Sequence, residues 1–392
     1  MSKIQVKDLY KIYGDCSQYA LKLAKAGVTR ERIFEQIGAT IAISGSTFTV
    51  KKNEIFVIMG SSGCGKSTLL RSINGLISPT AGKIYVEGKN IAKISEKALR
   101  HIRRFHISMV FQQFSLLPHR TVADNIALGI EIQGLPLVTQ SQRIEKAINL
   151  VGLKGNEMKA IQDLSGGMRQ RVGLARALAT NSDILLMDEA FSALDPLLRI
   201  QLQDELIGIQ KKTNKSIIFI THDLDEALKL GSSIAIMRDG KIIQIGTPEE
   251  ILTNPANEYV NSFTKHVDRS RIITAYSILQ KIETAFIQET IHIATKRMQR
   301  NNFSNLFIID DNGCFCGYIT MKDILKLNKQ QLKYRTIASV IKKSIKTTLP
   351  ETSIKKLLKI ASKNSLPIPV INKENKFLGI LTRSSILRSI AK

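Results

Sequence analysis

Residues 54–67 read EIFVIMGSSGCGKS, an apolar stretch that runs directly into a glycine-rich loop. The apolar part has the length of a strand and lacks polar alternation, which predicts a parallel strand buried on both faces. Gly60–Ser67 then fits the phosphate-loop pattern G-x-x-x-x-G-K-S between a strand and a helix. Glycine lets backbone N–H groups curl around phosphate oxygens, while Lys66 reaches the β and γ phosphates and Ser67 ligates Mg²⁺. The stretch therefore predicts a nucleotide site at the end of a strand.

Two further apolar runs have the same character, DILLMDE at 183–189 and SIIFITH at 216–222. Helical stretches lie between the three runs, and this alternation predicts an α/β domain with a mainly parallel sheet. In such sheets ligands bind beyond the carboxyl ends of the strands. Because Asp188, Glu189 and His222 stand at those ends, we expect them to lie beside the phosphate loop.

Each of these three residues also has an ordinary interpretation. Asp188 and Glu189 suit an acidic loop, and a lone histidine such as His222 is more often structural than functional. An acid pair directly after a buried strand nevertheless suits one carboxylate that holds Mg²⁺ and a neighbour that accepts a proton from the attacking water. Since all three follow strands of one sheet, we interpret them as parts of one site.

A second glycine-led helix start lies at 163–171, DLSGGMRQR. Asp163 or Ser165 suits the cap of a helix that begins near Gly166, and Gly166–Gly167 lets backbone N–H groups face an anion. One strand-end site does not easily place both helix starts around one γ-phosphate. We therefore expect two copies of the chain to pair head to tail, each lending its second helix start to the other's nucleotide.

The composition of the 392 residues suits two or three folded domains rather than a disordered chain or a membrane channel. Hydrophobic residues make up 43%, no apolar run approaches the roughly 18 residues of a membrane span, and no signal peptide is evident. The net charge is +24, and residues 265–392 hold 24 Lys and Arg against 8 Asp and Glu. Such a surface suits nucleic acid, anionic lipid or an acidic ligand, or it is only a solvated face.

Past residue 265 the chain contains an internal repeat with a period of 62 residues. NLFIIDDNGCFCGYITMKDIL at 305–325 matches PIPVINKENKFLGILTRSSIL at 367–387, with Gly317 aligned on Gly379. Each copy reads as strand, turn, strand and helix. Two such units are expected to pack into one small domain.

The strand-end motifs together resemble the ATP-binding subunits of ABC transporters over residues 1–265. LSGGMRQR is similar to that family's signature, MDEAFSALD places Asp195 at the end of its D-loop, and VFQQ supplies Gln112 as the Q-loop residue. The resemblance implies that Glu189 is the general base, that His222 contacts the γ-phosphate, and that Gln112 touches Mg²⁺ and the lytic water.

The same resemblance implies a site for ATP and Mg²⁺. Its nucleotide-contacting residues, in one copy or across the dimer, are Tyr13, Gly60, Ser61, Ser62, Gly63, Cys64, Gly65, Lys66, Ser67, Thr68, Ser165, Gly166, Gly167 and Asp195. Its metal ligands are Ser67, Gln112 and Asp188, and its catalytic group is Glu189, His222, Gln112 and Lys66. Tyr13 takes the place of the aromatic residue that stacks on adenine, and the nearby Tyr10 is the alternative.

Within the ABC proteins, the chain resembles the ATPase of the glycine betaine/proline (quaternary amine) importers. Three features carry this resemblance: a short helical insert at 15–41, the stretch QQFSLLPHRTVADN at 112–125, and the C-terminal repeat. The resemblance implies that the chain is the motor of an importer and that the solute passes through other subunits.

The C-terminal repeat resembles a tandem CBS module, with one CBS repeat at 280–334 and a second at 335–392. In the first repeat, Thr320 and Asp323 match the nucleotide-binding Thr-x-x-Asp of such modules, the carboxylate suiting ribose hydroxyls. The second repeat has Ser385 where the acid would stand. An adenine nucleotide or an anionic lipid is the ligand that we expect at this module.

The resemblance thus implies a P-loop NTPase (ABC ATPase) domain with a mainly parallel sheet and a helical subdomain, followed by a smaller α+β tandem CBS domain. It implies a homodimer on the cytoplasmic face of the cell (inner) membrane, bound to permease subunits and acting indirectly with a substrate-binding protein. We expect no nucleic acid partner. The alternatives are an importer of another solute, a nucleic-acid-associated ABC ATPase, and a purely regulatory nucleotide-binding protein.

Overall fold

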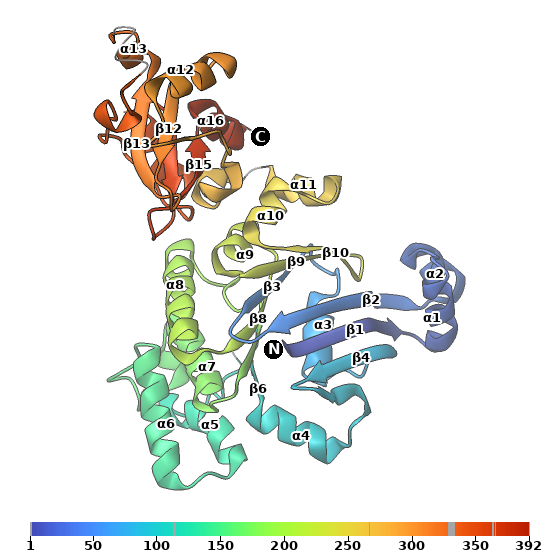
Figure 1. Ribbon diagram of the computed structural model, residues 1–392. Coiled ribbons are helices and arrows are strands. Elements are labelled where there is room, and N and C mark those ends of the chain that lie inside the picture. The colour runs from blue at the N-terminus through green and yellow to red at the C-terminus, as the bar shows by residue number, and fades with distance from the viewer. Residues whose placement is uncertain are drawn as a thin grey trace. The chain divides into compact units, whose positions relative to one another are not determined.

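The computed structural model describes residues 2–112, 115–265, 267–327, 334–362, 364 and 366–391 (Figure 1). The chain divides into two compact units, residues 1–267 and 268–392. Gln113 and Phe114, which belong to the stretch at 112–125, lie outside the described residues. Within these ranges, no helix combines the length and the apolar character that crossing a bilayer requires.

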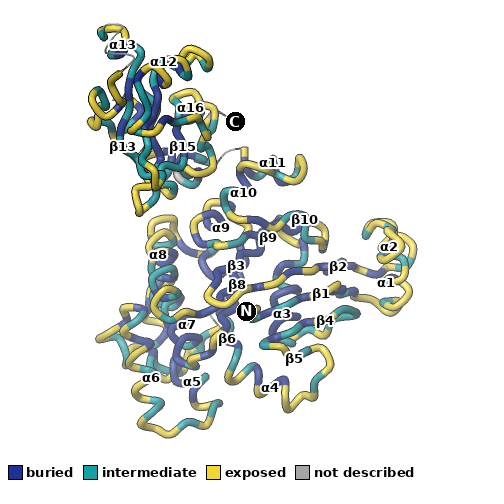
Figure 2. The backbone as a smooth tube through the Cα atoms, viewed as in Figure 1, coloured by how far each residue is buried: buried dark blue, intermediate teal, exposed yellow. Residues whose placement is uncertain are grey.

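The main sheet of the first unit has the strand order β10–β9–β3–β8–β7–β6. Its strands are β3 (Ile55–Met59), β6 (Ile107–Val110), β7 (Ile184–Asp188), β8 (Ser216–Thr221), β9 (Ser233–Arg238) and β10 (Lys241–Gly246). Neighbours from β9 to β6 pair in parallel, and β10 at the edge pairs antiparallel to β9. Every residue of β3, β7 and β8 is buried, as Figure 2 shows for β3 and β8 in dark blue. The prediction of a mainly parallel sheet is confirmed.

A second, antiparallel sheet of the same unit has the order β2–β1–β4–β5. Its strands are β1 (Ser2–Tyr13), β2 (Thr40–Lys51), β4 (Ala81–Val86) and β5 (Lys89–Asn90). Phe48 of β2 stacks on Phe56 of β3 with ring centroids 5.1 Å apart. The two sheets therefore share one apolar core.

Helices follow the strands of the first unit in sequence. A helical subdomain, green in Figure 1, consists of α5 (Val122–Gln133), α6 (Leu137–Leu150) and α7 (Gly166–Ala179). The other helices are α3 (Lys66–Ile73), α4 (Glu96–Phe105), α8 (Pro196–Thr213), α9 (Leu224–Leu230), α10 (Pro248–Thr253) and α11 (Glu258–Thr264). Short 3₁₀ turns lie at Ile91–Lys93 and Ile161–Asp163.

The predicted insert between β1 and β2 forms two helices, α1 (Ser17–Lys25) and α2 (Arg30–Ile37). Thr29 caps α2 by accepting a hydrogen bond from the N–H of Arg32. Ala20 of α1 and Ile33 of α2 are fully buried in a small core that also includes residues of β1 and β2. The insert is therefore a packed extension of the antiparallel sheet.

The second unit contains two copies of a strand–turn–strand–helix motif. The first copy is β12 (Asn305–Ile309), β13 (Phe315–Thr320) and α13 (Met321–Ile324), and β11 (Ala285–Phe286) extends its sheet. The second copy is β14 (Ile368–Ile371), β15 (Phe377–Leu381) and α16 (Arg383–Ala391). Each has its own apolar core, with α12 (Ile291–Arg300) on the first and α15 (Ile354–Ala361) on the second. Further 3₁₀ turns lie at Arg269–Arg271, Tyr276–Ile278 and Ile337–Ser339.

Aromatic rings join the two copies. The ring of Phe377 in β15 stacks at 5.9 Å on both Phe307 of β12 and Phe315 of β13. Each copy thus buries part of its apolar surface against the other, and the α+β module confirms the predicted fold class of this unit.

Candidate active site

Three neighbouring strands of the main sheet end at the same edge. Met59 of β3 pairs with Thr221 of β8, and Asp188 of β7 pairs with Ile220 of β8. The residues that follow these strands are the phosphate loop, Glu189 and His222, so their side chains start close together. This placement follows from parallel pairing, because the carboxyl ends of parallel strands face one way.

The phosphate loop after β3 packs tightly against the backbone of neighbouring segments. Gly65 has a φ of +104°, and a Cβ there would lie 2.1 Å from the carbonyl oxygen of Ala42. A Cβ on Gly60 would lie 2.1 Å from the carbonyl oxygen of Met237. Neither position accepts a side chain. The loop residues Ser61, Ser62 and Gly63 are exposed above this base, Cys64 is buried, and Thr68 is half-buried in the first turn of α3.

Lys66 is the first residue of α3, and its side chain is 4% exposed. Its ammonium group donates to the carbonyl oxygens of Gly60 and Ser61, each at 2.9 Å. It also lies 3.9 Å from Oε1 of Glu189. The cation is therefore held over the loop and faces the carboxylate that follows β7.

Ser67 and Asp188 form a pair of oxygen ligands. The hydroxyl of Ser67 donates to Oδ1 of Asp188 at 2.8 Å, and Asp188 is 2% exposed. Burial raises the pKa of the Asp188 carboxyl above its ordinary value, although the Ser67 hydrogen bond and the Arg71 charge oppose this shift. Arg71 of α3 lies 3.9 Å away. A buried carboxylate beside a hydroxyl suits Mg²⁺, which prefers oxygen ligands, so these residues fit the predicted metal.

Glu189 collects polar contacts from three elements. Nε2 of Gln112 donates to Oε2 of Glu189 at 3.3 Å, and Nδ1 of His222 lies 3.2 Å from the same oxygen. With Lys66, these residues form the predicted catalytic group. Glu189 has a φ of +44°, a left-handed conformation that is strained for any residue with a side chain. Gln112 contacts Glu189 here rather than the Ser67–Asp188 pair, with which it was predicted to bind metal.

The second glycine-led helix start lies in the helical subdomain. Ser165 is the N-cap of α7 and accepts a hydrogen bond from the N–H of Met168 at 3.3 Å, which decides between Ser165 and Asp163 as the cap. Ser165 and Gly166 are exposed, and Gly167 is buried. Asp195 is likewise an exposed N-cap, that of α8, and accepts from the N–H of Leu198 at 3.0 Å.

The two candidate tyrosines differ in burial. Tyr10 is 8% exposed, whereas Tyr13, at the end of β1, is 43% exposed. The ammonium of Lys11 lies 4.8 Å from the centroid of the Tyr13 ring. Of the two rings, that of Tyr13 is the one open to a planar ligand.

The Thr-x-x-Asp motif of the second unit is engaged within the chain. Thr320 donates to Oδ2 of Asp323 at 2.6 Å, and the ammonium of Lys342 lies 2.8 Å from the same carboxylate. The hydrogen bond from Lys342 holds the pKa of Asp323 below its ordinary value. A cavity of about 500 Å³ in this unit is lined by Tyr318, Lys343, Ser344, Ile345, Lys346, Asn364 and Leu366.

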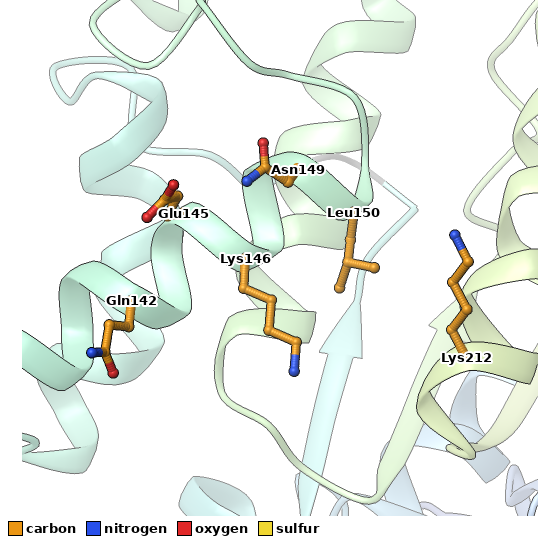
Figure 3. Close-up of a pocket in the computed structure, with 6 residues that line it drawn as sticks. All are labelled: Gln142, Glu145, Lys146, Asn149, Leu150 and Lys212. Atoms are coloured by element: carbon orange, nitrogen blue, oxygen red, sulfur yellow. The ribbon is translucent and has the colours of Figure 1, made fainter.

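A cleft of about 490 Å³ lies in the first unit between α6 and α8 (Figure 3). Lys146 of α6 and Lys212 of α8 stand on its opposite sides, with Gln142, Glu145, Asn149 and Leu150. A smaller cavity beside it is lined by the last residues of three helices, Leu150, Ala179 and Thr213. Helix C-termini carry partial negative charge, which accounts for the basic side chains here. No residue of the predicted site lines this cleft.

Sequence reasoning missed two arginines near the site, Arg71 beside Asp188 and Arg199 beside Asp223. Arg71 follows Lys66 on α3, and Arg199 lies one helical turn after Asp195. These positions on the two helices could have indicated that the arginines lie near the site. They do not indicate which residue, distant in the sequence, each arginine pairs with.

Comparisons with known proteins agree with this geometry. The family described as ABC transporter matches residues 43–192, and the CBS domain family matches residues 275–329 and 337–392. The glycine betaine transport ATP-binding protein OpuAA of Bacillus subtilis is 44% identical over 390 residues, covering 99% of this chain and 92% of the relative. The glycine betaine/carnitine transport ATP-binding protein GbuA of Listeria monocytogenes is 44% identical, covering 100% and 98%.

A third relative, the glycine betaine/proline betaine transport system ATP-binding protein ProV of Escherichia coli, is 42% identical and covers 99% of this chain and 97% of its own length. Among solved structures, the ATP-binding cassette MJ0796, a dimer in a post-hydrolysis state bound to ADP and Pi, is 28% identical with a TM-score of 0.53 and covers 62% of this chain and 98% of its own. CbiO1 of Clostridium perfringens, part of the ABC transporter complex cbiONQ, is 26% identical with a TM-score of 0.55, covering 65% and 92%. The chain therefore belongs to the ABC transporter ATP-binding proteins, in the family of the glycine betaine and proline betaine transport ATP-binding proteins, and carries a tandem CBS module.

Proposed function

We propose that this chain is the ATP-hydrolysing subunit of an importer for glycine betaine, proline betaine or a related quaternary amine. The observation that carries the proposal is the convergence of Gln112, His222 and Lys66 on the carboxylate of Glu189, at 3.3, 3.2 and 3.9 Å. Full-length relatives named as glycine betaine transport ATP-binding proteins support the choice of solute.

Glu189 is the general base in this proposal. Its side chain is 16% exposed and directly follows the end of β7, where an attacking water would be bound beyond the strand ends. His222 and Gln112 hold the carboxylate in place, and His222 is exposed enough to contact a γ-phosphate as well. Phosphoryl transfer needs positioning and charge neutralisation more than covalent help, which is what this arrangement supplies.

Lys66 and the loop N–H groups neutralise the phosphates. To reach β and γ oxygens, the Lys66 ammonium exchanges its two hydrogen bonds to loop carbonyls for bonds to phosphate. The backbone N–H groups of 60–68 and the N-terminus of α3 face the same anion. Tyr13 stacks on the adenine, because its ring is exposed at the end of β1.

Ser67 and Asp188 hold the metal ion, and Gln112 joins them when it turns from Glu189. A metal ion held by these residues would supply positive charge that offsets the negative charge developing on the phosphate during transfer. Burial raises the pKa of the Asp188 carboxyl and so disfavours its ionised form. A cation bound beside it opposes this effect and favours the ionised form.

Two copies of the chain form the active unit. Ser165, Gly166 and Asp195 are exposed, and within the part of the chain that the structure describes they form no hydrogen bond to the Lys66 loop, so they can face a nucleotide held by a second copy. The dimer of MJ0796 supports this arrangement, since that cassette was solved as a dimer with ADP and Pi.

The partners that follow are integral membrane permease subunits and, indirectly, a substrate-binding protein, with this chain peripheral on the cytoplasmic face of the cell (inner) membrane. Residues 1–265 act as the motor. The repeats at 280–334 and 335–392 regulate it by binding an adenine nucleotide or anionic lipid. The 500 Å³ cavity with Lys343 and Lys346 supports an anionic ligand. Asp323 does not line this cavity, and its carboxylate accepts ribose hydroxyls only after release from Lys342.

Glu189→Gln tests the function directly. The variant keeps the phosphate loop but loses the base, so ATP binding persists while hydrolysis falls by at least about 10²-fold. Fluorescent ATP titration and phosphate release on the full chain measure the two quantities. Hydrolysis near the wild-type rate would contradict the assignment.

Ser165→Arg tests the dimer, because the residue serves the opposite copy. Hydrolysis is lost while ATP binding by the single chain is unchanged, and mixing with Lys66→Ala chains restores one composite site. Ser95→Arg is the matched control, since Ser95 caps α4 with the same 3.3 Å hydrogen bond that Ser165 makes at α7. Loss of ATP binding in Ser165→Arg chains alone would place the helix start in its own chain's site.

A further inference from the structure

The loops that carry the proposed catalytic groups leave neighbouring strands and enter different helices. One runs from Glu189 to Asp195 into α8, and the other contains His222 and enters α9. Backbone pairing joins them only at the strand ends, where the N–H of Glu189 donates to the carbonyl of Ile220 at 3.1 Å. Beyond that bond, side chains must set how the two loops lie.

Arg199, in the first turns of α8, contacts both loops. Its Nη2 donates to the carbonyl oxygens of Ser192 and Leu194 at 3.3 and 3.1 Å. Its Nη1 donates to Oδ2 of Asp223 at 3.3 Å. A guanidinium suits this position because its planar fork presents several donors in fixed directions, which an ammonium does not.

These contacts close a ring around the catalytic pair. The N–H and the hydroxyl of Ser192 donate to the carbonyl of Glu189 at 3.2 and 2.9 Å. Asp223 directly follows His222 and also caps α9 through its Oδ1. The ring returns to its start where His222 meets Glu189 at 3.2 Å. Beside the direct contact between His222 and Glu189, Arg199 provides a second link between the two loops beyond the sheet.

Glu189 needs such support, because its left-handed backbone persists only where surrounding contacts hold it. We propose that Arg199 is a positioning residue that locks the Glu189 loop to the His222 loop and so sets the separation of base and γ-phosphate contact. Because Asp195 ends the first of these loops, the same lock couples the exposed cap of α8 to His222. The inference rests on the proposed ATPase function, and it adds the residue that holds the Glu189 loop and the His222 loop in position relative to each other.

The other interpretation of Arg199 is an ordinary ion pair between two helices, and the chain provides a control for it. Lys229 of α9 pairs with Asp204 of α8 at 2.7 Å and donates to the carbonyl of Ile200. This bridge also joins α8 to α9, but its partners lie on the helices rather than in the loops. Breaking it loosens the same two helices without releasing the catalytic loops.

The test compares Arg199→Gln, Asp223→Asn, their double variant, Arg199→Lys and Lys229→Gln in the full chain, by Mg·ATP hydrolysis, ATP binding and thermal unfolding. Asp223→Asn keeps an oxygen for the α9 cap and removes the charge that Arg199 meets. In Arg199→Gln we expect kcat to fall by about 10²-fold, the loss typical of a small misplacement, with KM for ATP within about 2-fold.

Asp223→Asn should lose a similar factor, and the double variant no more than either single one, because both break the same link. Arg199→Lys should recover about a tenth of the lost rate, while Lys229→Gln should stay near wild type. An additive double variant, an equal loss in Lys229→Gln, or unchanged kcat in Arg199→Gln would overturn the inference. If Arg199→Gln is active and Glu189→Gln is inactive, the inference fails and the proposed function stands; an active Glu189→Gln would overturn both.

Discussion

Two aspartates of this protein, Asp188 in the first unit and Asp323 in the second, each accept a hydrogen bond from a hydroxyl. Ser67 donates to Asp188 at 2.8 Å, and Thr320 donates to Asp323 at 2.6 Å. A basic side chain stands near each, Arg71 at 3.9 Å and Lys342 at 2.8 Å. The pKa of Asp188 is nevertheless raised and that of Asp323 lowered.

Burial accounts for the difference. Asp188 ends a central strand and is 2% exposed, so the loss of water outweighs its hydrogen bond with Ser67 and the charge of Arg71 at 3.9 Å. The Asp323 side chain is 21% exposed and touches its lysine directly. The Asp188 carboxylate is thus only partly compensated within the chain, which agrees with the metal site proposed above. The Asp323 carboxylate is already paired with Lys342 and accepts a ligand only after that pair opens.

The largest difference between the two aspartates is expected in ATP hydrolysis. Asp188→Asn should lower Mg²⁺-dependent ATP hydrolysis by at least about 10²-fold, because a metal ligand worth several kcal/mol at the transition state is lost. Asp323→Asn, the matched control, should hydrolyse ATP at a rate within about 2-fold of wild type. Asp323 belongs to the second unit and is no part of the proposed ATP site, and substitutions outside such features have small effects. Phosphate release by the full chain measures both, and equal losses would show that the two carboxylates are not functionally distinct.

A smaller effect is expected in stability without nucleotide or metal, and here the two variants should differ in sign. Asp188 has a folded pKa above the ordinary 3.8, so its charge opposes folding at neutral pH. Asp188→Asn should therefore raise the Tm of the first unit by about 2–4 °C, the shift for about 1 kcal/mol. This gain should shrink as pH falls through the raised pKa toward 3.8.

Asp323 has a folded pKa below 3.8, so its contribution to stability is present above that pH and is lost as pH falls through the folded pKa. Asp323→Asn should lower the Tm of the second unit by about 1 °C at neutral pH, because a partly exposed ion pair contributes little. Calorimetry at several pH values with EDTA measures both variants. Shifts of the same sign would contradict the role given to burial.

A further effect on stability concerns the second repeat, where Ser385 stands in place of the acid. Ser385 and Thr382 already form a reciprocal cap at the start of α16, with both hydrogen bonds at 3.1 Å, and the first turn of α16 has no acidic residue. Ser385→Asp should keep this cap and add a charge that the helix N-terminus favours, raising stability by about 0.5 kcal/mol. Urea unfolding measures the gain. A loss would indicate that the new carboxylate is buried as Asp188 is.

Much of the candidate site could be predicted because parallel strands end at the same edge of a sheet. A residue at the end of a strand in the sequence is therefore also placed in space. Each apolar run predicted a buried strand, and the polar residue at its end was thereby placed at a common edge. Asp188, Glu189 and His222 became neighbours by this reasoning alone, and their contacts agree with it. The helix caps at Ser165 and Asp195 follow from equally local chemistry, since a cap requires only residues within one turn.

The partners of charged side chains could not be predicted in the same way. The contacts of Arg199 with Asp223 and of Lys342 with Asp323 join residues from separate elements, and the sequence pattern marks neither pair. Burial likewise decided that Tyr10 is enclosed and Tyr13 open, although the two lie three residues apart on one strand.

The sequence by itself determined the phosphate loop, the strand ends, the glycine-led helix and the repeat, because each rests on spacing along the chain and on the chemistry of single residues. Only the tertiary structure decided which charges are paired, which carboxylate is desolvated and which loop is tied to which. Those properties depend on distance and on access of water, and both are set by packing between segments that are far apart in the chain.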